Sequence, residues 1–180
     1  MEYAPSLTFL VVYLTTDSLR SAGWSGAGLA LTTCFLYARG TLSPHSLFLG
    51  INLYLLGITP TIEALYAFDL DAAGAVLNAY AQPLLFFSIL VTGCILATVS
   101  KAGFLNIPHA NDSLSTKQSN RILIGVSAAA TVWALSFDSN RFLQMSLPMI
   151  LLFATHKALA ARAIRQSTEP RPAPLGTHPE

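Results

Sequence analysis

The chain has 180 residues, of which 53% are hydrophobic and only 11% charged, and its mean hydropathy is +0.54 with a formal net charge of +1. Soluble domains carry about 25% charged residues, so this chain has too little polar surface to cover an apolar core in water. The near-zero net charge and the lack of basic runs with interleaved aromatics argue against nucleic acid as a partner. The composition therefore predicts a membrane protein whose solvent is the lipid bilayer.

Six apolar segments have the composition of transmembrane helices, which need about 20 apolar residues to cross a core of about 30 Å. They lie at residues 3–19, 22–38, 46–63, 75–100, 122–137 and 142–161. The first is short, and the fourth is long enough to span with tilt. The N-terminus lacks the positive region of a cleaved signal peptide, so we expect the first segment to stay in the mature protein. The prediction is an all-α, polytopic transmembrane helical bundle over residues 1–165.

Two polar stretches flank the last two segments. Residues 101–121 form a polar linker, and the proline-rich residues 166–180 are expected to be a disordered tail. With six spans, eight of the ten Lys and Arg residues lie on the side of the linker and tail, and only Arg20 and Arg141 lie on the other. The eight are Arg39, Lys101, Lys117, Arg121, Lys157, Arg162, Arg165 and Arg171. The positive-inside rule then predicts that both termini are cytoplasmic.

Small residues recur four positions apart in two of the segments. Ala22, Gly26 and Ala30 form one such stripe, and Gly125 with Ala129 forms another. Residues four apart share a helix face, and small side chains let helices approach closely in lipid. We expect helix packing at both stripes, either within the chain, in a homo-oligomer or with other membrane proteins.

Polar residues within the spans are candidates for function, because each needs a partner or water in hydrocarbon. They are Asp17, Asn52, Glu63, Asn78, Gln82, Gln144, His156 and Lys157. A candidate polar site combines Asn52 with Glu63 and the helix break at Pro60, where freed carbonyls could help to coordinate a proton or cation. Asp17 is a second carboxylate of the same kind.

A structural interpretation competes with this site and is favoured for each residue. Glu63 would be an interfacial acid at a helix end, and Asn52 would make an interhelical hydrogen bond. Asp17 would form a local ion pair with Arg20, three residues on. Lys157 would be the snorkelling end of a helix rather than a Schiff-base lysine.

The chain carries no recognisable catalytic or metal-binding motif. GxSxG, HExxH, Walker and Rossmann patterns are absent from the sequence. The four histidines are scattered, and Cys34 and Cys94 stand alone, so no metal site and no cofactor is predicted. No span places two acids, or a histidine and an acid, one helical turn apart. This argues against an intramembrane enzyme without excluding one built across spans.

The layout of the chain is similar to that of a known family. The first span ends in YLTTD at Tyr13–Asp17, and the second contains SGAGLALTT at Ser25–Thr33. A basic polar break follows near Lys101, and the last two spans are joined by a short turn containing Asn and end in basic residues. These features resemble the bacterial intracellular septation protein A family of small inner-membrane proteins. Its members are commonly aromatic-rich with about five spans, whereas this chain is rich in Ala and Leu and has six predicted spans.

The resemblance implies a location in the bacterial inner membrane and a role in envelope integrity and division, exerted through protein contacts with no known reaction. It transfers no functional residues to this chain. The leading hypothesis is therefore a non-enzymatic inner-membrane protein that works through helix contacts with membrane partners. The alternative is a small-solute or ion transporter or channel with a polar site near Asn52, Pro60 and Glu63, and an intramembrane enzyme comes third.

Overall fold

The computed structural model describes residues 4–40, 46–99, 104, 113–136 and 141–168. This part of the chain is all-α, with seven helices and no strand. The helices are α1 (Ala4–Thr16), α2 (Leu19–Ala38), α3 (Ser46–Ala67), α4 (Asp71–Ala79), α5 (Ala81–Val99), α6 (Ser113–Ser136) and α7 (Arg141–Thr168). Within the described residues, α3, α5 and most of α7 are long and apolar enough to cross a membrane, which indicates a membrane protein.

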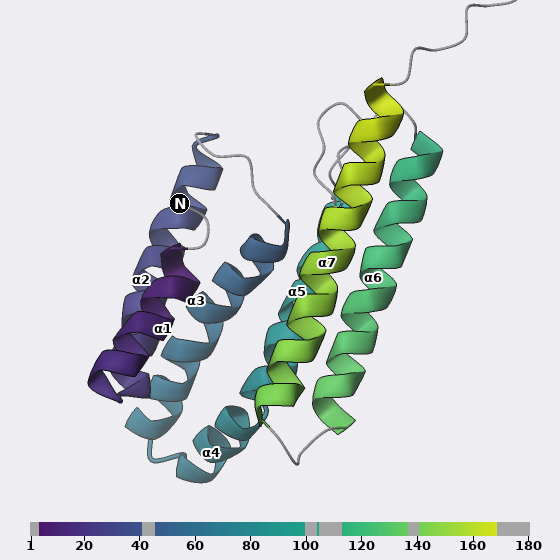
Figure 1. The fold of residues 1–180 in the computed structure, drawn as a ribbon. Helices are drawn as coiled ribbons and strands as arrows, with labels where there is room; N and C mark the ends of the chain where they lie inside the picture. Colours follow the sequence, from purple (N-terminus) through teal and green to yellow (C-terminus); the bar gives the residue numbers. More distant parts are fainter. Residues whose placement is uncertain (1–3, 41–45, 100–103, 105–112, 137–140, 169–180) are drawn as a thin grey trace, which may run out of the picture.

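Consecutive long helices run antiparallel and pack on their neighbours in chain order (Figure 1). The first three helices form one group, and α5, α6 and α7 form a second. The two groups meet where α3 packs on α5. A second contact between the groups joins α3 to α7, where the rings of Phe48 and Phe153 lie 5.6 Å apart. The short helix α4 lies at the lower end of the molecule, between α3 and α5 (Figure 1).

The predicted span 75–100 is a correction, because it is two helices and not one. The helical assignment is interrupted at Tyr80, between α4 and α5. Pro83 lies in the first turn of α5, where it has no N–H to donate to the carbonyl of Ala79, although Pro60 and Pro148 lie inside uninterrupted helices. Hydrogen bonds resume at once, with the Leu84 amide donating to the Tyr80 carbonyl at 3.0 Å. Only α5 therefore carries the apolar length of a span.

The remaining boundaries shift by up to nine residues, and mostly outward. α6 begins at Ser113, so the second half of the predicted linker 101–121 is helical. α7 continues to Thr168, into the predicted tail, and residues 169–180 lie outside the described residues. α1 has 13 residues, which gives a length of about 20 Å at 1.5 Å per residue. It is shorter than a bilayer core, as the sequence led us to expect for the first segment.

The core lies between the two helix groups and is built from apolar side chains of five long helices and Phe104. Its buried members are Ala30, Leu47, Phe48, Ile51, Leu55, Leu85, Phe86, Ile89, Phe104, Leu123, Ala130, Ala134 and Leu152. Many other large apolar side chains remain exposed on the outer faces of the helices. An exterior of this kind suits lipid, because lipid tails are as apolar as the side chains that they contact.

Candidate functional site

The closest helix contact joins α3 to α5 at Gly50. A Cβ atom added to Gly50 would lie 2.8 Å from the backbone Cα of Ile89, so only glycine fits there. One residue before Ile89, the Ser88 hydroxyl donates to the Gly50 carbonyl at 3.0 Å. Sequence analysis missed this contact, although Ser46 and Gly50 carry the same four-residue spacing as the two predicted stripes.

The predicted stripe on α2 lies on the inner face of that helix. Ala22 and Ala30 are fully buried, and Gly26 is buried between them. A Cβ atom added to Gly26 would lie 3.2 Å from the Phe9 Cβ and 3.4 Å from the Pro5 carbonyl oxygen. The stripe therefore holds α1 close to α2, and its Gly26 also approaches α3.

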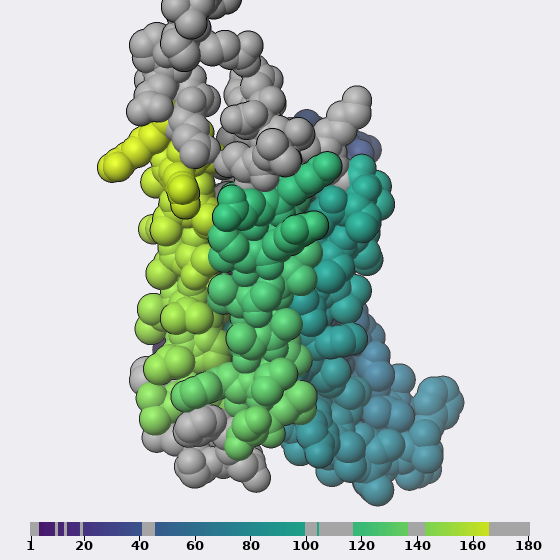
Figure 2. Space-filling view, turned by 90° about the vertical axis from the view of Figure 1, so that its right-hand side faces the viewer, coloured from purple at the N-terminus to yellow at the C-terminus, as the bar shows by residue number. Residues whose placement is uncertain are grey.

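The second predicted stripe, on α6, lies on an exposed face of its helix. Gly125 and Ala129 are exposed, and a Cβ atom added to Gly125 would meet no other atom within 4 Å. The inner face of α6 is formed instead by Leu123, Ser127 and Ala130. Figure 2 shows α6 between α7 and α5, with its outer surface largely uncovered. Gly125 thus faces open space within the described chain and Ala129 is exposed, and a contact of this stripe with another chain stays a prediction.

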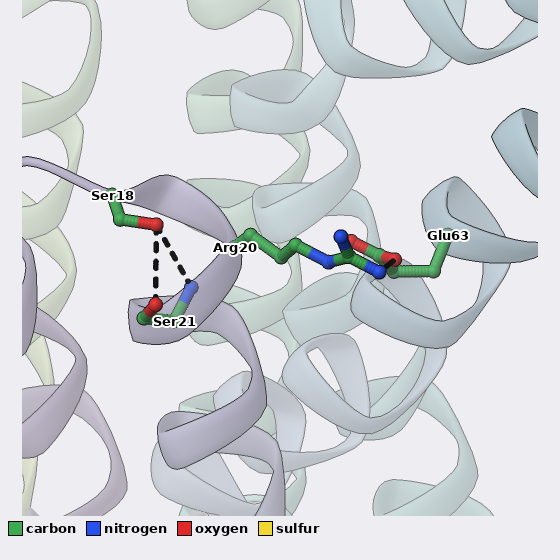
Figure 3. Close-up of polar contacts among 4 residues, drawn as sticks. All are labelled: Ser18, Arg20, Ser21 and Glu63. Atoms are coloured by element: carbon green, nitrogen blue, oxygen red, sulfur yellow. Dashed lines mark hydrogen bonds and ion pairs between the residues drawn. The ribbon is translucent and has the colours of Figure 1, made fainter.

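Glu63 forms an ion pair with Arg20, and the two side chains come from α3 and α2 (Figure 3). The Nη2 and Oε2 atoms are 2.7 Å apart, and the side chains are 75% exposed for Arg20 and 25% for Glu63. Arg20 thus pairs with Glu63 rather than with Asp17. The expected spacing of Asp17 and Arg20 required one continuous helix, but Asp17 adopts a positive φ of 50° in the turn between α1 and α2.

The start of α2 explains how Arg20 is directed. Ser18 is the N-cap, and its hydroxyl accepts a hydrogen bond from the Ser21 amide at 3.3 Å (Figure 3). Such a cap satisfies one of the amides left free in the first turn of a helix. Arg20 lies in that first turn and reaches across to α3.

Asn52, the other polar member of the candidate site, is not brought together with Glu63, whereas Pro60 precedes Glu63 by three residues on α3. Asn52 is 1% exposed, and its Nδ2 atom has no hydrogen-bond partner within the described residues. Pro60 is exposed. Asn52 and Glu63 are separated along α3 by about 16 Å at 1.5 Å per residue. A single substrate-sized cation cannot contact both, and the Glu63 carboxylate is paired with Arg20.

A contact that sequence analysis did not find involves Phe104 of the polar linker. Its backbone amide donates to the Asn120 Oδ1 atom at 2.9 Å, and its carbonyl accepts a hydrogen bond from the Ser46 hydroxyl. Its ring is fully buried against Gly93, where an added Cβ atom would lie 2.5 Å from the ring. Phe104 therefore joins α3, α5 and α6. In the sequence, the signal for this buried contact was an aromatic residue within a polar segment.

The other polar residues of the predicted spans lie in different surroundings. The Tyr54 hydroxyl donates to the Ala81 carbonyl at 2.8 Å, and the Gln144 Nε2 atom donates to the Ala134 carbonyl. The Gln82 Oε1 atom is buried without a hydrogen-bond partner in the described part of the chain. Asn78 and Lys157 are exposed, whereas His156 is buried. Among the described residues, no group of three or more His, Cys, Asp or Glu side chains could hold a metal ion.

Comparison of the chain with protein-family models, with curated proteins and with solved structures finds no match. Function therefore rests on the geometry described above. Polar contacts join different helices of the chain, as in the pairs Arg20–Glu63 and Ser88–Gly50. Such contacts stabilise a bundle.

Proposed function

We propose that this chain is a non-enzymatic integral protein of the bacterial inner membrane, which supports envelope integrity or division through helix contacts with membrane partners. The observation that carries the proposal is the use of the candidate polar site for internal structure, since Glu63 is paired with Arg20 and lies far from Asn52. The exposed stripe at Gly125 and Ala129 supports a contact with a partner helix. The bacterial inner membrane and the role in division rest on the layout that resembles the septation family.

The experiment is complementation in a bacterial strain that lacks the protein. We expect the deletion to produce a division or envelope defect, which the wild-type chain corrects. Gly125→Leu should fail to correct it while reaching the membrane in normal amounts, because the larger side chain would hold a partner helix away. Gly28→Leu is the matched control, since Gly28 is also an exposed helix glycine with no atom within 4 Å of an added Cβ. Equal complementation by both variants would contradict the contact at α6.

The proposal includes six spans with both termini in the cytoplasm. The alternating direction of the six longer helices supports it (Figure 1), and so does the distribution of charge. Arg39, Lys117 and Arg165 lie toward the end of the bundle where α2 and α7 end and α6 begins, whereas Arg20 lies at the start of α2. This is the asymmetry that the positive-inside rule relates to orientation.

Cysteine labelling tests this topology. In a chain whose native Cys34 and Cys94 are replaced by Ala, single cysteines at Ser113 and Asp71 should react with impermeant reagents from opposite sides of the membrane, with Ser113 on the cytoplasmic side. Labelling of both positions from one side would overturn the six-span arrangement. The result is independent of what the protein binds.

Transport is the second candidate function, and the buried Asn52 amide favours it. An Nδ2 atom with no partner in the described residues could donate to a passing solute, and polar groups within a membrane are commonly functional. Asn52→Leu separates the two functions. The helix-contact proposal expects full complementation by this variant, whereas a transporter should lose both complementation and solute flux in vesicles, with folding intact.

A further inference from the structure

Helix α4 lies between two helices that are long and apolar enough to cross a membrane, α3 and α5, but it is too short to cross one itself. Its 9 residues extend about 14 Å at 1.5 Å per residue, whereas a hydrocarbon core is about 30 Å thick. The two neighbouring helices run antiparallel and pack against each other. The helix therefore lies at the end of the bundle where the chain passes from one to the other (Figure 1).

The ion pair of Arg20 with Glu63 marks the depth of this end in a membrane. The Arg20 side chain is 75% exposed, and an exposed charge is costly within hydrocarbon, so the pair belongs at the edge of the hydrocarbon core. Tyr66 follows Glu63 by three residues on α3, which is about 4.5 Å farther along the helix. The Tyr66 ring covers Gly74 of α4, where an added Cβ atom would lie 3.0 Å from the ring. Since the head-group layer extends about 5 to 8 Å beyond the core, this contact places α4 at the level of the head groups.

The side chains of α4 are sorted onto three faces. Gly74 is buried against Tyr66, so one face packs on α3. Asp71 and Asn78 are exposed on a second face. Val76 is also exposed, and at 100° per residue it lies about 140° around the helix from Asp71 and about 160° from Asn78. The helix thus presents a polar and an apolar surface in opposite directions, while its third face holds it to the bundle.

The apolar surface extends to residues that flank α4. Tyr80, four residues after Val76 and on the same side of the helix, is exposed, and so are Phe68 and Leu70 before the helix. A tyrosine ring favours the membrane interface, where its carbon atoms contact acyl chains and its hydroxyl contacts water. Residues 64–80 contain no Lys or Arg. This segment is therefore suited to a membrane surface by its apolar area and not by attraction to anionic head groups.

We propose that α4 is an interfacial helix, which lies in the membrane surface with Val76 and Tyr80 against the acyl chains and with Asp71 and Asn78 in water. Its partner is the lipid of the leaflet at this end of α3 and α5. The apolar surface of α4 is continuous along the chain with the apolar exteriors of these two helices, which favours lipid over a soluble protein as its partner. The surface depends neither on the contact proposed for α6 nor on which side is cytoplasmic, so it can fail separately from the proposed function.

Spin-label accessibility in lipid vesicles tests the orientation of α4. In the full chain with Cys34 and Cys94 replaced by Ala, Val76→Cys and Asn78→Cys are spin-labelled separately and placed in phosphatidylcholine vesicles. Both positions are exposed, so each labelled chain should melt at the temperature of its Cys-free parent. We expect oxygen, which partitions into lipid, to reach the label at Val76 better than a water-soluble nickel chelate does. At Asn78, the matched control on the polar face, we expect the reverse.

Leu53→Cys provides the reference for full lipid contact, because Leu53 is exposed within the span α3. Better access of the nickel chelate at both α4 positions would place the helix in water, and better access of oxygen at both would place it within the hydrocarbon core. Low access of both reagents at Val76, compared with Leu53, would mean that protein covers the apolar face. Each of these three results would overturn the proposal.

Discussion

Helices α2 and α6 carry the same pattern of small residues at four-residue spacing but use it on opposite surfaces. On α2 the pattern is buried, and Gly26 lies against α1 and α3. On α6 the pattern is exposed, and Gly125 has free space around it. The difference teaches that small residues allow a helix to approach but do not identify which helix approaches.

The position of each helix in the bundle explains this difference. α2 packs on both α1 and α3, and its stripe faces these neighbours. α6 packs on α5 and α7 through a face that includes Leu123, Ala130 and Ala134. Gly125 and Ala129 lie on another face of the same helix, which neither neighbour covers. Substitutions at glycines of the two kinds should therefore differ in their effect on stability.

The largest effect is expected for Gly50→Leu, because the new side chain would meet the backbone of α5 at Ile89. Backbone atoms cannot rotate away, so we expect a loss of about 3 kcal/mol or more in the free energy of unfolding. Gly57→Leu is the control on the same helix, where an added Cβ atom meets nothing within 4 Å. Thermal melting in detergent measures both. Similar melting temperatures for the two variants would contradict the close contact of α3 and α5.

Gly26→Leu should have a smaller but clear effect, since Phe9 can move by a few tenths of an ångström. We expect normal insertion into the membrane and a loss of about 2 kcal/mol in stability. Gly28→Leu, which points into free space on the same helix, should change stability little. Equal losses from the two variants would show that the buried stripe on α2 does not hold α1 in place.

Glu63→Gln should change stability by only about 0.5 kcal/mol, because exposed ion pairs contribute little. The Arg20 side chain is 75% exposed, and added salt should reduce the effect further. The measurement is a double-mutant cycle with Arg20→Gln, followed by melting at low and high salt. A coupling of several kcal/mol, or a loss of solute flux in the folded Glu63→Gln variant, would give this carboxylate a role beyond the ion pair.

Gly125→Leu should have the smallest effect on the isolated monomer, within about 0.5 kcal/mol. Its added Cβ meets nothing within 4 Å, and Leu has a higher helix propensity than Gly. Melting of the monomer in detergent, compared with Gly57→Leu, measures this directly. A loss as large as that of Gly26→Leu would mean that α6 packs against another part of the chain on its outer face.

The amino-acid sequence by itself determined the class of the molecule. Long apolar runs predict helices, and five of the six predicted segments correspond to one helix each. The division at Tyr80 did not follow from Pro83 alone, because Pro60 and Pro148 also lack a backbone donor and lie inside continuous helices. The burial of Ala22 and Ala30 agrees with the face predicted from their spacing.

The tertiary structure alone decided which residues meet. The pairing of Arg20 with Glu63 depends on the turn at Asp17 and on the packing of α2 against α3. The burial of Phe104 depends on three helices that approach it from distant parts of the chain. Local periodicity repeats within one helix, so it predicts which residues share a face. It carries no information on the neighbour that covers that face, because helix packing joins residues far apart in sequence.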